Sequence, residues 1–460
     1  MPHALVREAD GTFTFAPFSW KPRRVGDTQT NPPPPFIGRR LRDVFFYKNR
    51  LGYLVDETVV FSVAGDYGDF WRRTVLDYID SDVLAVTATT TDVSVLDYAV
   101  PFNDGIMLFS AQRQFSLSNG ESGLSASSVE VSPVTAFSTS PNVRPVPLGT
   151  QVYFASDSGG SVSIQEYTRL DGVDATDAAE VTAHVPGLIK PGVSKLIAIP
   201  DYNAVVVLRA LAEDRNIAYV YQFFWDGQKK VVSAWRPWDF GSGKIISGTF
   251  FSGDLYLLMR RGDDFFLERM NLQPEAKSAD QDHLIYLDRG VSITGTYDAL
   301  ADHTTFTLPY SPDPDLFRLL QTKNADYPEN MVPATKYTLV DDTVTIPGDV
   351  SATPLTAGEV FTTRFVFSRQ FPQDYQLRPL TTGRLQIHTF SVTYTASAYF
   401  EAHVQPYGAD AVGSTDELTQ VVPFNGRLIG TASYRLGNLP YRSGTFTFPV
   451  AGDASLAYIA

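Results

Sequence analysis

Closely spaced carboxylates are the residues of this sequence that could most directly carry out chemistry. Two such pairs, Asp263/Asp264 and Asp66/Asp69, have the residue type that glycoside hydrolysis requires. That reaction places two carboxyl groups about 5–9 Å apart on either side of the scissile bond. Acidic pairs are also common in turns, and their spacing along the chain does not supply this geometry. The pairs alone therefore do not predict an enzyme.

Three tryptophans offer a second chemical possibility, a surface on which sugar rings stack. Trp225, Trp235 and Trp238 lie close together in the sequence and have tyrosines nearby. Large aromatic side chains also supply much of the packing between elements of a β protein. We favour the packing role, and a polysaccharide-binding face remains the alternative.

Other motifs are incomplete for the chemistry they resemble. Gly241-Ser-Gly-Lys244 is similar to a phosphate-binding loop, but Ile245 stands where that loop needs Ser or Thr, and its upstream glycine is missing. Asp171, Asp174 and Asp177 could bind calcium, although the start of a helix explains their spacing better. No nucleotide or calcium site is predicted.

Neither the histidines nor an integrin-type tripeptide indicates a functional site. The six histidines include no pair at metal-ligand spacing, and the chain has no cysteine, so thiolate zinc sites and disulfides are excluded. Arg261-Gly262-Asp263 lies between two apolar runs, where a hairpin turn favours Gly and Asp. We predict no catalytic residue, no metal site, no cofactor and no enzymatic activity.

Composition favours a large β protein. The 460 residues are 43% hydrophobic and 13% aromatic, with 31 Phe and 23 Tyr but 5 Met. Aromatic residues are enriched in strands, and the scattered 33 Gly and 30 Pro suit many turns. No apolar run approaches the roughly 18 residues that span a bilayer, and the N-terminus lacks the pattern of a signal peptide. We expect no membrane anchor.

Charge is unevenly distributed along the chain. The net charge is −14, but residues 1–50 carry nine Lys or Arg against four acids, which leaves −19 on the remainder. An acidic body repels nucleic acid and anionic membranes. The basic segment near the N-terminus could dock on an acidic partner surface or contact phosphate, or it could be a solvated surface. The candidate docking residues are Lys21, Arg23, Arg24, Arg39, Arg40 and Arg42.

The elements that would position all these residues are strands repeated at regular intervals. Residues 41–62 read as strand, turn and strand, with apolar aromatic runs on both sides of a polar segment at 48–52. Turn residues then recur at spacings of 53, 44, 54 and 50 residues, at Gly52, Gly105, Gly149, Asn203 and Gly253. A period of about 50 residues made of strands and turns predicts divergent β-propeller blades.

Four segments follow from this pattern. We expect an extended N-terminal arm at 1–40 with a polyproline stretch, and propeller blades at 41–272. A small β domain, inserted or appended, is expected at 273–380, and C-terminal strands at 381–460 are expected to return to the propeller or a platform. One helix is predicted over 174–184, between an acidic N-cap and Pro186. The fold class is all-β.

Several short stretches resemble the tail nozzle proteins of short-tailed, podovirus-type bacteriophages, known as tail tubular protein B. They occur in order along nearly the whole chain, and each is weak alone. The family-motif residues to which we give structural roles are Asn49, Arg50, Gly52, Trp235, Trp238 and Asp239. The stretches are Val25-Gly-Asp27 with Asn31-Pro32, Asp43-Val-Phe-Phe46, Asn49-Arg-Leu-Gly52, Tyr98-Ala-Val-Pro-Phe102, Tyr153-Phe-Ala-Ser156, Thr182-Ala-His-Val-Pro186, Trp235 to Gly241, Gly383-Arg-Leu385 and Phe448-Pro-Val450.

The resemblance implies a structural role in the virion. Proteins of this family contain a propeller, form six-fold rings below the portal and adaptor, line the exit channel for phage DNA and help to close it. Tail adaptor and tail fibre proteins are then the expected partners, and the chain would be made in the host cytoplasm. Known relatives extend further at both ends, so we expect a fragment or split product. The alternative is a tail-borne propeller that binds or cleaves host surface polysaccharide.

The uneven charge agrees with that implication. Cationic walls would bind phosphates and release counterions, whereas an acidic wall repels the backbone and lets a duplex slide. We therefore expect acidic loops to face the channel and the basic segment 21–42 to dock on a neighbouring subunit.

Overall fold

The structure is a computed structural model of the 460-residue chain. It describes residues 2–77, 79–88, 93–102, 105–118, 124–125, 128–169, 176–213, 215–227, 229–273, 285–322, 331–366, 374–376, 378, 380, 389–394, 399–406, 420–425, 444–449 and 454–459.

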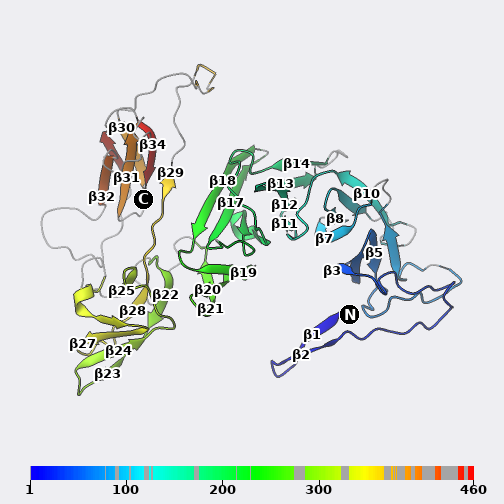
Figure 1. Ribbon diagram of the computed structural model, residues 1–460, viewed down its shortest axis with the longest axis horizontal. Helices are drawn as coiled ribbons and strands as arrows, with labels where there is room; N and C mark the ends of the chain where they lie inside the picture. The colour runs from blue at the N-terminus through cyan, green and yellow to red at the C-terminus, as the bar shows by residue number, and fades with distance from the viewer. Residues whose placement is uncertain are drawn as a thin grey trace. The chain divides into compact units, whose positions relative to one another are not determined.

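The described residues form antiparallel sheets and no α-helix, which confirms the all-β prediction. Two short 3₁₀ turns, η1 (Pro200–Tyr202) and η3 (Ala334–Lys336), are the helical elements of the described part. The chain divides into two compact units, Met1–Leu272 and Gln273–Ala460, shown in Figure 1.

The first unit contains five successive sheets of the propeller-blade type. Their first strands begin at Leu41, Leu96, Val146, Lys195 and Lys244, so successive starts are 49–55 residues apart, close to the predicted period. The first two sheets are β3 (Leu41–Tyr47), β4 (Arg50–Val55), β5 (Thr58–Phe61) and β6 (Leu84–Thr87), then β7 (Leu96–Phe102), β8 (Gly105–Ser110), β9 (Gln114–Ser118) and β10 (Glu130–Thr135).

The next three sheets continue the pattern. The third contains β11 (Val146–Leu148), β12 (Gln151–Ser158), β13 (Ser161–Arg169) and β14 (Thr176–Glu180). The fourth contains β15 (Lys195–Ile199), β16 (Ala204–Leu208), β17 (Ile217–Asp226) and β18 (Lys229–Asp239). The fifth contains β19 (Lys244–Phe251), β20 (Asp254–Arg261) and β21 (Asp264–Asn271). The first strand of each sheet lies beside the first strand of the next, which is the arrangement of blades in a propeller.

Neighbouring sheets of this series pack face to face because strand residues alternate between two cores. In β4, Leu54 joins the core shared with the second sheet, while Tyr53 and Val55 point to the opposite face. In β16, Val205 and Val207 face the third sheet, whereas Val206 and Leu208 face the fifth. Period-two alternation thus buries both faces of the inner sheets.

The N-terminal segment begins with a two-stranded hairpin, β1 (His3–Arg7) and β2 (Phe13–Pro17). After it, the chain runs over the outer face of the first sheet, which is the face turned away from the second sheet. The cluster there combines Trp20 and Phe36 of this segment with Tyr53, Val60 and Phe70. Part of the segment predicted to be an extended arm is therefore packed on the first sheet.

Two sequence predictions are wrong in this unit. The helix expected over 174–184 is not formed, because Thr176–Glu180 is the strand β14, paired with β13 from Gln165 to Arg169. Gly52 is not in a turn but inside β4, and the two-residue turn consists of Lys48 and Asn49 at φ 43° and 58°. Such left-handed pairs match the twist of a hairpin. Asp171 and Asp174 lie outside the described residues.

The second unit has its own core. One sheet contains β22 (Asp288–Ile293), β28 (Leu355–Glu359) and β25 (Phe317–Gln321), and another contains β23 (Thr296–Asp298), β24 (His303–Thr307), β27 (Thr343–Pro347) and β26 (Thr338–Val340). Phe306, Phe317 and Val344 are buried in their shared cluster. Asp341, at φ 53°, lies in the turn between β26 and β27.

The last strands of the second unit form two further sheets. One contains β29 (Phe365–Val366), β34 (Ala454–Ile459), β31 (Tyr399–Pro406) and β32 (Gln420–Asn425), and the other pairs β30 (Thr389–Tyr394) with β33 (Gly444–Pro449). The Gly383–Leu385 motif lies outside the described residues.

Candidate functional site

Aromatic packing fixes the N-terminal segment to the first sheet. Trp20 lies against Phe36, Phe70 and Tyr53, with ring centroids 5.4, 5.6 and 6.2 Å apart. Phe36 and Phe70 meet edge to face at 5.0 Å. Such pairs add to the stabilisation that comes from burial of apolar area. This cluster of four rings, which we call the aromatic cap, closes the outer face of the first sheet.

Hydrogen bonds around the aromatic cap hold the backbone in register. The Lys21 amide donates to Gly68 O at 2.9 Å, and Trp71 Nε1 donates to Lys21 O at the same distance. Asn31, almost fully buried, donates from Nδ2 to the carbonyls of Val25 and Arg72 and accepts from the Arg72 amide. The motif residue Asn31 therefore joins two loops that are distant in the sequence.

Most of the basic residues predicted to dock on a partner have partners within this chain. Lys21 forms an ion pair with Asp66, Arg39 pairs with Asp56 at 3.0 Å, and Arg42 lies 3.5 Å from Asp97. Arg23 donates to the Asn31 carbonyl at 3.2 Å, and its guanidinium lies 5.5 Å from the centre of the Trp71 ring.

Two of the predicted docking residues differ from the rest. Arg24 and Arg40 are exposed and form no hydrogen bond or ion pair with the described residues. Burial raises the pKa of the nearby Asp97, while Arg42 and Arg40 oppose that rise. The N-terminal segment thus presents these two cations to solvent beside charges that are already paired.

The motif residues Asn49, Arg50 and Gly52 stabilise the start of the first sheet. Arg50 is buried and donates to the carbonyls of Ser62 and Asp82, at 2.7 and 2.5 Å, and to that of Asp80. Burial lowers the pKa of the Arg50 guanidinium, although Asp82 and Asp80 oppose this. Asn49 accepts a 2.7 Å hydrogen bond from Tyr67 Oη. A Cβ on Gly52 would overlap the Phe45 ring, which explains the need for glycine.

The tryptophan motif is divided between the two faces of the fourth sheet. Trp235 packs on the third-sheet side, where its ring is tilted against that of Tyr221 at a centroid distance of 5.0 Å, and its Nε1 donates to Val181 O at 2.8 Å. Trp238 packs on the fifth-sheet side. Asp239 accepts hydrogen bonds from Asn216 Nδ2 and the Gly241 amide. Because Trp235 and Trp238 face opposite ways, they form no common surface for stacking sugars.

A buried ion pair that the sequence analysis missed joins the third and fourth sheets. Lys230 Nζ lies 2.6 and 2.8 Å from the Glu166 carboxylate, which also accepts a 2.6 Å hydrogen bond from Tyr153 Oη. The ammonium lies 5.0–5.7 Å from the ring centres of Tyr221, Phe223 and Trp225. Cation–π attraction and a paired carboxylate together compensate for desolvation of both charges.

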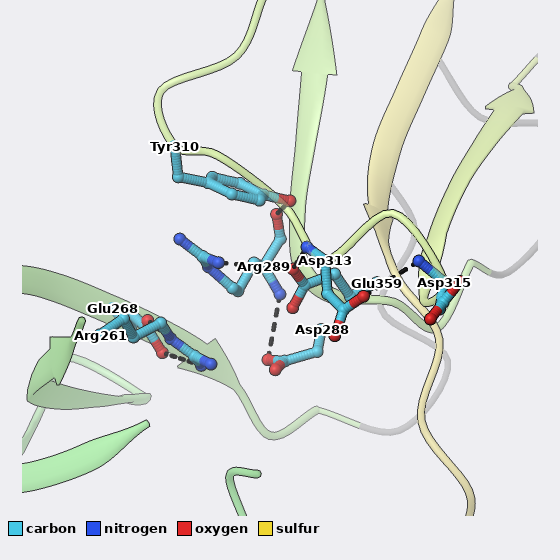
Figure 2. Close-up of polar contacts among 8 residues, drawn as sticks. All are labelled: Arg261, Glu268, Asp288, Arg289, Tyr310, Asp313, Asp315 and Glu359. Atoms are coloured by element: carbon cyan, nitrogen blue, oxygen red, sulfur yellow. Dashed lines mark hydrogen bonds and ion pairs between the residues drawn. The ribbon is translucent and has the colours of Figure 1, made fainter. Parts of the chain in front are cut away.

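Each unit also contains an arginine–glutamate pair, and Figure 2 shows both pairs. In the first unit, Arg261 binds Glu268 through two bonds of 2.6 and 3.0 Å across β20 and β21. In the second unit, Arg289 at φ 54° interrupts the pairing of β22 and lies 3.4 Å from Glu359. Its guanidinium stacks 3.6 Å from the ring centre of Tyr310, whose hydroxyl donates to Arg289 O. Each pair joins two neighbouring strands, so we assign both pairs a structural role.

The carboxylates weighed for catalysis are engaged in turns. Asp66 pairs with Lys21, and Asp69 accepts a hydrogen bond from the Trp71 amide. Asp263 pairs with Arg260 at 3.0 Å beside Gly262, whose φ of 62° confirms the predicted hairpin turn. Among the described residues, no group of three or more His, Asp or Glu is placed to hold a metal ion. No helix in the described part of the chain combines the length and apolar character needed to cross a membrane.

Solved structures with some likeness to this chain are distant. Hsv2p of Kluyveromyces lactis is 11% identical, with a TM-score of 0.31 over 58% of this chain and 80% of that one. A 6-phosphogluconolactonase described as putative, from Bacteroides fragilis, is 10% identical, with a TM-score of 0.32 over 52% of this chain and 64% of that one. A likeness at this level assigns neither a family nor a function.

Sequence comparison is much more specific. The tail tubular protein gp12 of Escherichia phage T7 is 29% identical over 475 residues, which cover 99% of this chain and 57% of the relative. The chain thus spans a little over half the length of that protein. The family model described as bacteriophage nozzle protein matches residues 1–460. The chain therefore belongs to the bacteriophage nozzle protein family and is a component of the phage tail.

Proposed function

We propose that this chain is a nozzle subunit that assembles with copies of itself around the DNA exit channel of a short-tailed phage. The observation that carries this proposal is the family match over all 460 residues. Its role is structural, in that it forms the channel wall and helps to close it before infection. Tail adaptor and tail fibre proteins are the proposed neighbours, and the ring is proposed to be six-fold.

The charge distribution supports a wall that passes DNA without holding it. Outside residues 1–50 the chain carries a net −19, and a surface of the same sign as the phosphates raises the energy of close approach. Three of the six candidate basic residues, Lys21, Arg39 and Arg42, are already paired with carboxylates. Pairing lowers their capacity to neutralise phosphate and release counterions.

Arg24 and Arg40 support a contact between subunits. Both are exposed without an ion pair to the described residues, on a segment that the aromatic cap holds in place. The proposed contact is with an acidic surface of a neighbouring tail protein. Replacing both with Glu should weaken assembly, because the attraction becomes repulsion, and Arg39→Glu provides a comparison at a residue already paired with Asp56.

Binding of duplex DNA tests the channel proposal. Fluorescence anisotropy with a labelled duplex at about 0.15 M salt should show no tight binding, and lowering the salt should reveal only weak, non-specific association. A positively charged DNA-binding protein assayed in parallel serves as the control. Tight binding with a steep salt dependence would show that the wall grips the phosphate backbone, and the conduit proposal would then fail.

A further inference from the structure

The two ends of the five-sheet series differ in a way that points to a subunit contact. At one end, the outer face of the first sheet is closed by the aromatic cap. At the other end, the outer face of the fifth sheet belongs to no buried cluster among the described residues. Every other face of the series packs against a neighbouring sheet or against the N-terminal segment.

The uncovered face of the fifth sheet is apolar at its centre. Leu258 pairs with Leu267, and Arg260 with Phe265, so Leu258, Leu267 and Phe265 lie on one face of β20 and β21. Phe265 and Leu267 are 63% and 72% exposed and Leu258 is 36% exposed, whereas Leu257 on the other face is buried. Such an apolar patch marks an interaction site.

A second uncovered apolar surface lies in the β1–β2 hairpin. Leu5 pairs with Phe15 and Arg7 with Phe13, which places Leu5, Phe13 and Phe15 on one face, with Arg7 beside Phe13. These three side chains are 62–70% exposed. An isolated two-stranded hairpin is only marginally stable in water. The hairpin therefore needs an apolar surface to pack against.

The charges around the two surfaces are complementary. The turn of the hairpin carries Glu8 and Asp10, and hydrogen bonds from Thr12 lower the pKa of Asp10, which keeps it ionised. The uncovered face of the fifth sheet carries Lys244, Arg260 and Arg269. Arg260 and Arg269 pair with Asp263 and Asp254, so Lys244 is the cation of this face that forms no ion pair with the described residues. Opposite charges at the rim favour the encounter and fix its orientation.

The hairpin belongs to one end of the series and the uncovered face to the other. Residues 18–36 follow the hairpin directly and are held on the first sheet by the aromatic cap and the Lys21–Gly68 hydrogen bond. The hairpin surface and the fifth-sheet surface of one chain are thus different patches. A contact that joins the hairpin of one copy to the fifth sheet of another is therefore heterologous. A heterologous contact joins copies head to tail and gives a ring when the rotation closes.

From these observations we propose that the hairpin β1–β2 of one copy packs Leu5, Phe13 and Phe15 on the Leu258–Phe265–Leu267 face of a second copy. This inference rests on the proposal that the chain assembles with copies of itself. It adds which two surfaces meet and the polarity of the contact.

Two variants, each blocking one surface, test the polarity. Phe15→Glu disables the hairpin and Leu267→Glu disables the sheet face, and both residues are exposed, so the fold should persist. Each variant alone should raise the dissociation constant of self-association by at least about thirtyfold, as for a hot-spot residue. An equimolar mixture should recover a one-to-one pair, because one intact hairpin then meets one intact face. Leu300→Glu, at a fully exposed leucine of the second unit, is the matched control and should change nothing.

The absence of cysteine from the chain allows a direct check of the contact. A mixture of Phe15→Cys and Leu267→Cys proteins should form a disulfide-linked dimer on mild oxidation, and Leu300→Cys with Phe15→Cys should not. A double variant that forms the disulfide within a monomer would overturn the proposal, since the hairpin would then cover its own fifth sheet.

Sedimentation velocity over a concentration series distinguishes the possible failures. Self-association that neither Glu variant weakens would overturn the hairpin contact while leaving assembly intact. A wild-type chain that stays monomeric throughout the series would overturn the contact and self-assembly together. Recovery of the pair in the mixture, with no effect of Leu300→Glu, supports the contact.

Discussion

Asp43 and Arg144, which lie 101 residues apart in the sequence, form a 2.5 Å ion pair that ties the first sheet to the segment entering the third. Asp43 Oδ2 also accepts a 2.9 Å hydrogen bond from the Ala99 amide of the second sheet, and Arg144 donates to Ala99 O at the same distance. One carboxylate and one guanidinium thus connect three successive sheets at their first strands. Both Asp43 and Tyr98-Ala99 lie in the family motifs.

We predict that Asp43→Ala lowers the free energy of unfolding by roughly 2–3 kcal/mol, because the buried Ala99 amide loses its charged acceptor. Hydrogen exchange of the Ala99 amide should accelerate in the variant. Asp56→Asn, which weakens the exposed Arg39–Asp56 pair, should cost less than about 1 kcal/mol. Unchanged exchange at Ala99 would contradict the role given to Asp43.

The Lys230–Glu166 pair gives the second prediction. Lys230→Met should destabilise the first unit by roughly 3–5 kcal/mol, because it leaves the buried Glu166 without its counter-charge. Adding Glu166→Gln should restore much of the lost stability, because neither charge of the Lys230–Glu166 pair then remains. Urea unfolding with hydrogen exchange in β13 and β17 measures both effects.

The control for the Lys230 variant is Arg260→Met, which removes the exposed pair with Asp263 and should cost less than about 1 kcal/mol. If the double variant were as unstable as the sum of its single variants, the two charges would not be coupled.

How much of the fold is readable from sequence depends on the range of the interaction. Blade starts and hairpin turns follow from local alternation and turn chemistry, and their predicted positions agree within a few residues. The helix predicted over 174–184 failed because an acidic N-cap and a following proline are local signals, whereas pairing of Thr176–Glu180 with β13 is a tertiary one. The local sequence pattern carries no information about the edge of β13 with which this segment pairs.

Buried charges escape sequence reasoning for a related reason. Glu166 lies between Gln165 and Tyr167 of β13, and nothing near it in the sequence indicates Lys230, 64 residues away. Asn31 lies in the predicted extended arm, and its side-chain amide makes three hydrogen bonds that join two loops. Asn49 and Gly52 are both predicted to lie in the turn at 48–52, but only Asn49 lies in the turn, and Gly52 is inside β4.

Stability at alkaline pH should depend on Tyr153. Burial, together with Glu166, raises the pKa of its hydroxyl well above the ordinary value of 10.0. The folded state therefore keeps this proton while the unfolded chain loses it near pH 10, so stability is present below pH 10 and falls as the pH rises further. The slope for one such group approaches about 1.4 kcal/mol per pH unit.

Unfolding by urea between about pH 9 and pH 11 measures this loss. Tyr153→Phe should make the decline shallower, although the variant starts from lower stability because Glu166 loses a hydrogen bond. Tyr375→Phe, at a tyrosine that is 91% exposed, should leave the pH dependence of the unfolding free energy as steep as in the wild-type chain. Equal slopes in all three proteins would rule out Tyr153 as a cause.

Gly52 provides a test of packing inside a motif. An added Cβ at this strand position would overlap the Phe45 ring, so Gly52→Ala must displace a ring that is itself packed edge to face on Phe61. We expect a loss of roughly 1–3 kcal/mol in the free energy of unfolding, the usual cost of overpacking. Phe45→Leu combined with Gly52→Ala should be less destabilised than the sum of the single changes, because the smaller side chain frees the space.

Gly290→Ala is the comparison for Gly52→Ala, since the nearest neighbour of its added Cβ would lie at an ordinary 3.5 Å and its φ is not in the left-handed region. That change should be close to neutral or slightly stabilising, because alanine restricts the unfolded chain. Thermal or urea unfolding of Gly52→Ala, Phe45→Leu, their double variant and Gly290→Ala measures these differences in stability. If Gly52→Ala were as well tolerated as Gly290→Ala, contact with Phe45 would not be the reason for glycine in the motif. The left-handed turn at Lys48 and Asn49 and the hydrogen bonds of Arg50 would then account for the stability of this hairpin.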